Sequence, residues 1–236
     1  MTENKGSPLV PAIVGGVIGA VLTAAVLLFA APQIVGSRIV RQGMLNDPQI
    51  LMDAADALRD RQYAPTLASS RGLLETPFGS SWKGAEKPEV VLVEFYDYAC
   101  PYCKASNPHV DQLLRENPGL RVVYRELPIL GPDSVVAARL SLAASKAGRF
   151  RQFHDALYAA GRPGPETNAA AARVANIPPT PTQDVAIEAE LKKNFSLAGQ
   201  LGATGTPLFV VGDRVLNGAV GYEALKKAVE DASKRS

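Results

Sequence analysis

The sequence predicts an α/β domain that follows an apolar N-terminal segment and a helical neck. Residues 90–96, VVLVEFY, form a continuous apolar run rich in β-branched and aromatic residues, which is typical of a strand buried on both faces. Helical patterns alternate with such runs along the rest of the chain. The composition of the 236 residues, 47% hydrophobic and 20% charged, is sufficient for a sizeable core.

The N-terminal segment, residues 1–32, is expected to be a membrane anchor. Residues 9–31 carry no charge, and about 20 apolar residues in a helix span a bilayer. A cleaved signal peptide is the alternative, but its apolar region is only about 7–15 residues long and follows a basic stretch, whereas Lys5 is opposed here by Glu3. Arg38 and Arg41 after the segment give a weak bias toward a cytoplasmic C-terminal part, although long domains translocate largely regardless of charge.

Residues 33–75 predict a helical neck. Asn46 or Asp47 provides a helix cap, and Pro48 suits the first turn. One face of the following short helix carries an apolar stripe, made of Ile50, Leu51, Ala54, Ala55 and Leu58. The stripe has to be buried, either against the chain's own domain or against a second copy of the chain, and the second option predicts a homo-oligomer.

Residues 76–89, TPFGSSWKGAEKPE, lack periodicity and are interpreted as a linker. Beyond the strand at 90–96, the patterns predict further strands at 120–126, 207–211 and 214–218, the last two joined by a tight turn at Gly212-Asp213. They also predict helices at 133–148, 150–160, about 184–201 and 222–235.

The two cysteines of the chain lie three positions apart in the stretch YACPYCKAS. Cys100 is expected at the N-terminus of a helix because Pro101 suits the first helical position. There the unpaired N–H groups and the helix dipole favour a thiolate, the species that attacks disulfides. Cys103, beyond Tyr102, lies one turn further on and could close a disulfide or resolve a mixed one. The pattern therefore favours redox chemistry.

Three other uses of the cysteine pair compete with redox catalysis. A structural disulfide would close too small a loop to stabilise much, and a zinc site needs about four ligands, whereas only the scattered His109 and His154 could complete it. Thiolates also bind Cu(I), so copper capture stays open. The formal net charge of +2 gives no reason to expect nucleic acid as a partner.

Glu94 stands in the middle of the apolar run at 90–96, six residues before Cys100. A carboxyl group at this position is expected to be buried, where desolvation raises its pKa and lets it exchange protons near neutral pH. The alternative is a side chain at the strand's edge that points to water.

Four separated motifs resemble the DsbA-type branch of the thioredoxin superfamily. They are VLVEFYDYACPYCK, YRELPILGPDS (124–134), FHDALY (153–158) and GATGTPLFVVGDRVLNGAVGYEALKKAV (202–229). The resemblance covers residues 86–236. It implies a thioredoxin fold with an inserted helical domain at about 132–203, and the activity of a protein-disulfide oxidoreductase.

The resemblance also implies roles for single residues. Cys100 corresponds to the nucleophile, Cys103 to the resolving cysteine and Glu94 to the buried acid of the family. Thr206 and Pro207 correspond to the loop whose proline is cis and whose backbone pairs with an extended client segment. No cofactor is implied other than the redox-active disulfide.

Two features leave the direction of the reaction open. The dipeptide between the cysteines is Pro101-Tyr102, whereas the strongly oxidising DsbA proteins carry Pro-His. The neck at 33–75 resembles the N-terminal extension of the copper-sensitivity-suppressor (ScsC) proteins, some of which oligomerise and act as isomerases. Oxidase, isomerase, reductase and a membrane-held Cu(I)-binding protein therefore stay open.

The resemblance implies a location outside the cytoplasm. Residues 33–236 are therefore expected in a bacterial periplasm, held at the inner membrane by a single-pass anchor. The expected partners are client proteins with cysteines and a membrane redox protein that reoxidises or reduces the pair.

Overall fold

The computed structural model describes residues 31–181 and 183–234, which fall into two compact units divided between Leu58 and Arg59. The expected membrane anchor, residues 1–32, lies outside the described residues apart from its last two residues, Ala31 and Pro32. Within residues 31–181 and 183–234, no helix combines the length and the apolar character that crossing a bilayer requires.

The N-terminal unit contains α2 (Ala31–Asn46) and the first part of α3 (Gln49–Glu75). Asp47 caps α3 as expected, because its Oδ1 accepts a hydrogen bond from the backbone N–H of Gln49 at 3.1 Å. Every residue of the predicted apolar stripe is exposed. The large exposed apolar side chains of this unit are Ile39, Val40, Met44, Leu45, Ile50, Leu51, Met52 and Leu58.

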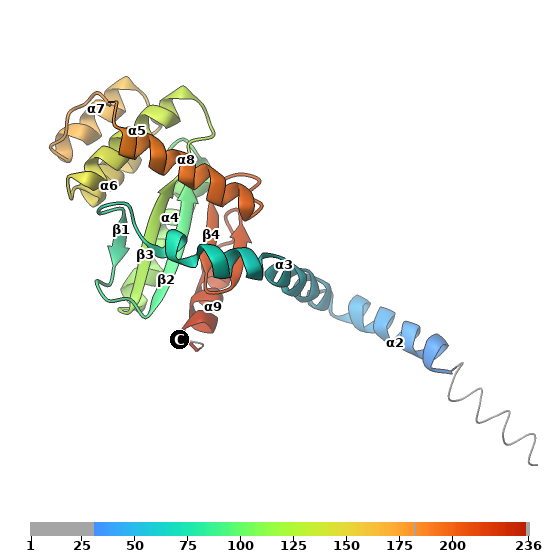
Figure 1. Cartoon of the computed structure of the whole chain (residues 1–236). Helices are drawn as coiled ribbons and strands as arrows, with labels where there is room; N and C mark the ends of the chain where they lie inside the picture. Colours follow the sequence, from blue (N-terminus) through green and yellow to red (C-terminus); the bar gives the residue numbers. More distant parts are fainter. Residues whose placement is uncertain (1–30, 182, 235–236) are drawn as a thin grey trace, which may run out of the picture. The chain divides into compact units, whose positions relative to one another are not determined.

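The C-terminal unit is built on a five-stranded sheet with the order β1-β3-β2-β4-β5. Its strands are β1 (Trp82–Gly84), β2 (Val90–Tyr96), β3 (Leu120–Glu126), β4 (Leu208–Val211) and β5 (Arg214–Asn217). β2 and β3 are parallel, and the other neighbours are antiparallel. Consequently the end of β2, the end of β3 and the start of β4 meet at one edge of the sheet (Figure 1).

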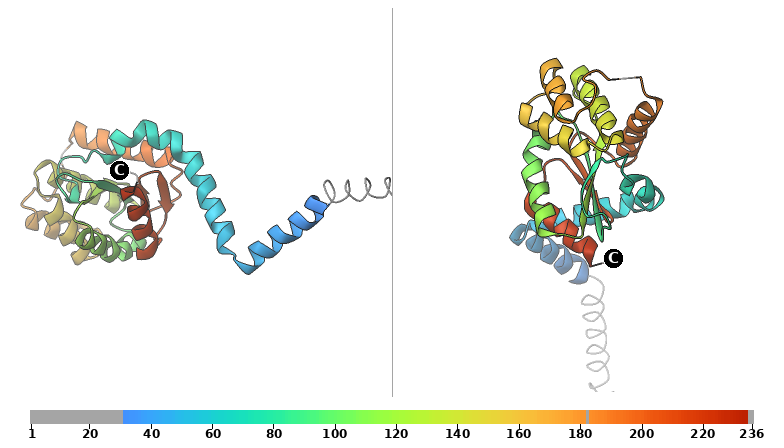
Figure 2. Two further views of the ribbon diagram at one scale, coloured as in Figure 1. Left: turned by 90° about the horizontal axis from the view of Figure 1, so that it is seen from below. Right: turned by 90° about the vertical axis from the view of Figure 1, so that its left-hand side faces the viewer.

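Helices cover both faces of this sheet. α4 (Pro101–Glu116) and α9 (Tyr222–Ser233) pack on one face, whereas residues 59–75 of α3 and α8 (Val185–Gln200) pack on the other (Figure 2). Side chains alternate between the two faces along β2. Leu92 and Tyr96 belong to the first core, which lies between the sheet and helices α4 and α9, and Val93 belongs to the second core, which lies between the sheet and helices α3 and α8. The strand therefore reads as a continuous apolar run because both of its faces are buried.

The inserted helices lie between β3 and β4, where the resemblance places them. They are α5 (Pro132–Lys146), α6 (Phe150–Ala160), α7 (Pro165–Val174) and α8. The sequence did not single out α7, whose residues 169–172 are all alanine. The expected thioredoxin fold with a helical insertion is confirmed.

The interpretation of residues 76–89 as a linker without regular structure is wrong at Trp82–Gly84, which forms β1. This edge strand pairs antiparallel with β3, with Lys83 opposite Val122. Three residues are too few to show a strand's alternation, so only the partner strand identifies it.

The predicted neck also extends too far. Residues 59–75 of α3 belong to the C-terminal unit, and Leu67 and Leu74 are each only 1% exposed in the second core. The helix that the sequence predicted to be short continues through Pro65 because its second half is stabilised by packing on the sheet.

Arg125 of β3 fixes the end of α3 to the sheet. Its buried guanidinium donates hydrogen bonds to carbonyl oxygens at the C-terminal end of α3, including those of Leu74 at 3.0 Å and Thr76 at 2.8 Å. It also donates to Glu190 at 3.0 Å and to Asn194 at 2.9 Å, both on α8. One cation therefore satisfies the unpaired carbonyls of a helix end and joins both helices of this face.

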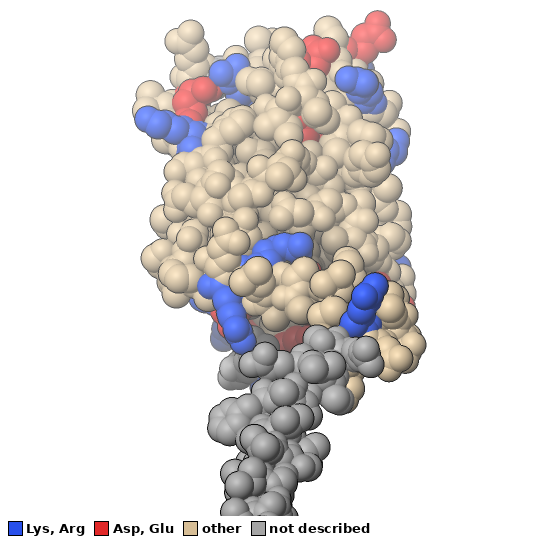
Figure 3. Space-filling view, turned by 90° about the vertical axis from the view of Figure 1, so that its right-hand side faces the viewer, with Lys and Arg blue, Asp and Glu red and all other residues tan. Residues whose placement is uncertain are grey.

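The face shown in Figure 3 carries few charged side chains. Most of this face is uncharged, and its lysine and arginine side chains occur singly or beside acidic ones, so they form no continuous basic surface.

Candidate active site

Cys100 and Cys103 lie at the start of α4, where the chain leaves β2. Cys100 is the N-cap residue and Pro101 the first residue of the helix, as the sequence predicts. Both cysteines are free thiols, with Cys100 4% exposed and Cys103 fully buried. Tyr102 between them is 65% exposed. The arrangement presents one sulfur near the surface and keeps the other beneath it.

The loop before β4 lies directly against Cys100. The Thr206–Pro207 peptide bond is cis, and the thiol of Cys100 donates a hydrogen bond to the carbonyl oxygen of Thr206 at 3.2 Å. Cys100 and Thr206 are far apart in sequence. They meet because β4 starts at the edge of the sheet where β2 ends. The structure thus brings the two motifs that the sequence singled out into contact.

Glu94 lies on the face of β2 that α4 covers, and it is 1% exposed. Burial raises its pKa to about 8, an effect that the charge of Lys83 partly opposes and that of Asp111 increases. Neither carboxyl oxygen has a hydrogen-bond partner among the described residues. The expectation that this acid is buried is confirmed, and its pKa permits proton exchange near neutral pH.

Cys103 is held in its thiol form by its surroundings. Burial raises its pKa, the charge of Glu94 raises it further, and hydrogen bonds from Asp97 and Thr206 oppose the rise. The charge of Glu94 acts on the Cys103 thiol, so the buried carboxyl lies within electrostatic range of this sulfur.

Lys83 is the basic residue that acts on Glu94, and the sequence analysis did not identify it. It extends from β1, is largely buried, and its Nζ lies 2.6 Å from Asp155 of α6 and 3.9 Å from Asp111 of α4. These residues line a cavity of about 300 Å³ beside α4. Lys83 was not identified from the sequence because the segment that carries it was interpreted as a linker.

Asp97 is a second residue that the sequence analysis missed. Its buried carboxylate accepts hydrogen bonds from the backbone N–H groups of Ala99 at 2.8 Å, Ile129 at 2.8 Å and Leu130 at 2.9 Å. One side chain therefore joins the cysteine loop to the loop that follows β3. An acidic residue directly after an apolar strand, three positions before a cysteine, is the signal that could have identified it.

Tyr98 anchors the cysteine loop to the helical insertion. Its hydroxyl lies 2.9 Å from Oγ of Ser141 on α5 and 3.3 Å from Nδ1 of His154 on α6. Burial holds the pKa of His154 well below its usual range. Among residues 31–181 and 183–234, no three His, Cys, Asp or Glu side chains are grouped to hold a metal ion.

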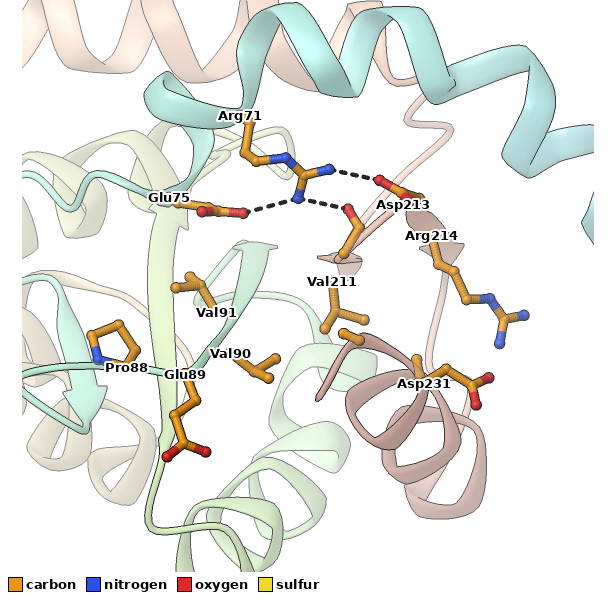
Figure 4. Close-up of a pocket in the computed structure, with 13 residues that line it drawn as sticks. Arg71, Glu75, Pro88, Glu89, Val90, Val91, Val211, Asp213, Arg214 and Asp231 are labelled. Carbon is orange, nitrogen blue, oxygen red and sulfur yellow. Dashed lines mark hydrogen bonds and ion pairs between the residues drawn. The ribbon is translucent and has the colours of Figure 1, made fainter. Parts of the chain in front are cut away.

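A separate pocket of about 430 Å³ lies at the opposite end of the sheet, where β2 begins (Figure 4). Val90, Val91 and Val211 are among its apolar lining residues. At its edge, the guanidinium of Arg71 donates to Asp213 at 2.6 Å, to Glu75 and to a backbone carbonyl (Figure 4). The pocket contains neither cysteine and is distinct from the candidate active site.

A sheet of this topology, with a Cys-x-x-Cys pair at a helix start beside a cis-proline loop, defines a thioredoxin-fold protein of the thiol–disulfide oxidoreductase class. More narrowly, the chain belongs to the DSBA-like thioredoxin domain family, which matches residues 91–230. The resemblance that the sequence suggested is thereby confirmed.

Solved structures of several bacterial proteins are similar to this chain. A periplasmic thioredoxin-like protein from Salmonella enterica serovar Typhimurium is 29% identical, with 70% of this chain and 95% of that one covered and a TM-score of 0.64. Proteus mirabilis ScsC in a transitional conformation is 28% identical, with 88% and 99% covered and a TM-score of 0.67. The thiol-disulfide exchange protein alpha-DsbA2 from Wolbachia pipientis is 26% identical, with 75% and 97% covered and a TM-score of 0.62.

A curated relative of different size is also similar to the chain. It is the Na(+)/H(+) antiporter NhaA 1 from Salinispora arenicola, which is 30% identical over 184 residues, or 73% of this chain. The chain covers only 28% of that protein's length.

Proposed function

We propose that this chain catalyses thiol–disulfide exchange on client proteins through Cys100 and Cys103. The observation that supports this most directly is the position of the Cys100 sulfur, at the start of α4 and within 3.2 Å of the Thr206 carbonyl. A helix N-terminus stabilises the negative charge of a thiolate.

The reaction proceeds in two exchanges. The Cys100 thiolate attacks one sulfur of a client disulfide, forms a mixed disulfide and releases the other client sulfur as a thiolate. Cys103 then loses its proton and attacks Cys100, which closes the Cys100–Cys103 disulfide and releases the second client sulfur as a thiolate. The client gains two electrons and the pair loses two, and the reverse sequence oxidises a client dithiol.

Glu94 is proposed as the group that receives the Cys103 proton. Cys103 is fully buried, so its proton has no direct route to bulk water. The buried carboxyl, whose pKa is raised to about 8, is mostly protonated at pH 7 and half-ionised near pH 8, so its ionised form can accept a proton and its protonated form can return one. Lys83 favours its ionised form and thereby assists the transfer.

An extended segment of the client is proposed to bind at the Thr206–Pro207 loop. Strand addition supplies backbone hydrogen bonds that do not depend on the client's sequence. This mode suits an enzyme whose clients share cysteines rather than a common motif.

The proposed location of residues 33–236 is a bacterial periplasm, with residues 1–32 as an inner-membrane anchor. The likeness to a periplasmic thioredoxin-like protein supports this location. A membrane redox protein would restore the working state of the cysteine pair, which needs no other cofactor.

Disulfide isomerisation is the second candidate, favoured by the exposed apolar residues of α2 and the first part of α3. If these side chains associate with those of a second copy, several cysteine pairs act around one client at high effective concentration. That arrangement suits the rearrangement of wrong disulfides, and the likeness to ScsC over 88% of this chain supports it.

Trapping of mixed disulfides tests the function. Cys103→Ser should accumulate mixed disulfides between Cys100 and client proteins, because the resolving thiol is missing, and Cys100→Ser is the matched control that should accumulate none. If Cys103→Ser traps no client, and Cu(I) binds the reduced wild-type pair tightly enough to block its alkylation, the chain is a copper-binding protein instead.

A further inference from the structure

The loop after β3 presents two exposed aliphatic side chains at the edge of the sheet where Cys100 lies. Ile129 and Leu130 are each 44% exposed, although the two residues before them are buried. They follow β3, which lies next to β2 on the side opposite to β4. The cysteine loop is therefore flanked by the Thr206 loop on one side and by these two residues on the other.

Asp97 fixes the distance between this aliphatic pair and the cysteine loop. One carboxylate oxygen accepts from Ala99, directly before Cys100, and the other accepts from both Ile129 and Leu130. The three backbone N–H groups thus converge on a single buried side chain. Hydrogen bonds to a carboxylate are stronger than those between neutral groups, so the two loops are held as one rigid surface.

From this geometry we propose that Asp97 is a positioning residue for client selection. It holds Ile129 and Leu130 where they contact an apolar side chain next to the client's cysteine. The substrate class is then an extended segment with an aliphatic or aromatic residue beside its reactive cysteine, as occurs in unfolded chains that expose future core residues. This inference rests on the proposed exchange reaction and specifies which clients bind well.

Two observations favour an extended client segment as the ligand of this surface. The Thr206 loop and the aliphatic pair lie on either side of the cysteine loop, so a segment whose sulfur reaches Cys100 passes close to both. Side chains of an extended segment alternate in direction, which allows backbone pairing at one loop and side-chain contact at the other.

The test uses two synthetic disulfide peptides that are identical except for leucine or serine beside one cysteine. The full chain reduces each peptide, with dithiothreitol regenerating the dithiol form, and KM and kcat are measured separately. Wild type should show a KM that is roughly five- to tenfold lower for the leucine peptide, as expected for one partly buried aliphatic contact. Asp97→Asn and Leu130→Ser should each remove this difference through KM.

Asp97→Asn keeps the size of the side chain but places an amide group, which can offer only one acceptor oxygen, among three donors. Leu130→Ser changes an exposed side chain and keeps the test valid if the Asp97 variant does not fold. Val174→Ser on α7 is the matched control, since Val174 is also an exposed aliphatic residue (64%), and it should keep the full preference.

The inference is overturned if wild type reduces both peptides with equal KM, or if the preference survives in the folded Asp97→Asn variant or in Leu130→Ser. If wild type reduces neither peptide, the proposed function itself fails. The two failures are therefore distinguishable.

Discussion

Replacing Glu94 with glutamine should change the pH dependence of stability in the reduced protein. The pKa of this carboxyl is raised from 4.5 in the unfolded reference to about 8 in the folded protein, chiefly by burial. Between these pH values the folded protein keeps a proton that the unfolded chain releases. The stability associated with this group is therefore fully present below pH 4.5 and is lost as the pH rises to about 8.

The size of the effect follows from the same values. Each pKa unit corresponds to about 1.4 kcal/mol, so the rise from 4.5 to about 8 corresponds to about 5 kcal/mol. Glu94→Gln removes the titration but keeps the size of the side chain. The free energy of unfolding of the variant minus that of wild type should therefore increase by about 1.4 kcal/mol per pH unit between pH 4.5 and 8, and level off above.

Urea unfolding of the reduced proteins at five pH values from 4.5 to 9 measures this difference. Glu86→Gln is the matched control because it makes the same change at an exposed side chain. A flat difference for Glu94→Gln across the whole range would refute the raised pKa, and with it the role of Glu94 as proton acceptor for Cys103.

Three further outcomes are expected. Arg125→Met should lower the free energy of unfolding by about 3–5 kcal/mol, because a buried carboxylate and the carbonyls at the end of α3 lose their donor; urea unfolding with a loss below about 1 kcal/mol would contradict this. Tyr98→Phe should lower the free energy of unfolding by about 1–2 kcal/mol in the same assay, since the hydrogen bonds of its hydroxyl to Ser141 and His154 are lost, and no loss would show that this anchor is unimportant. Residues 33–236 should sediment as an oligomer and the Leu51→Glu, Leu58→Glu double variant as a monomer; identical masses would exclude association through these exposed side chains.

The sequence determined the elements that carry strong local signals. The continuous apolar run at 90–96, the hairpin at Gly212-Asp213 and the proline after Cys100 identified β2, the β4–β5 pair and the start of α4. The position of Glu94 within an apolar run was enough to predict its burial. Each of these features depends on neighbouring residues, which is why no knowledge of the fold was needed.

The linear pattern did not reveal the features that depend on pairing between distant segments. β1 exists because β3 offers an edge, and Lys83 reaches the neighbourhood of Glu94 only through that pairing. Likewise, residues 59–75 of α3 belong to the C-terminal unit because their apolar side chains pack on the second face of the sheet. Their sequence pattern is similar to that of the neck before them, so the pattern did not separate the two parts.

The same distinction between local pattern and distant contact holds for the residues of the candidate active site. The spacing of Cys100 and Cys103 indicated the chemistry, whereas only the tertiary structure places the Thr206 carbonyl 3.2 Å from the sulfur. Asp97 shows the distinction most clearly: the sequence contains an ordinary acidic residue after a strand, and the fold converts it into the acceptor for two loops. Hydrogen bonds between distant segments have no periodicity, so a chain's pattern can specify the reacting groups without specifying what holds them in place.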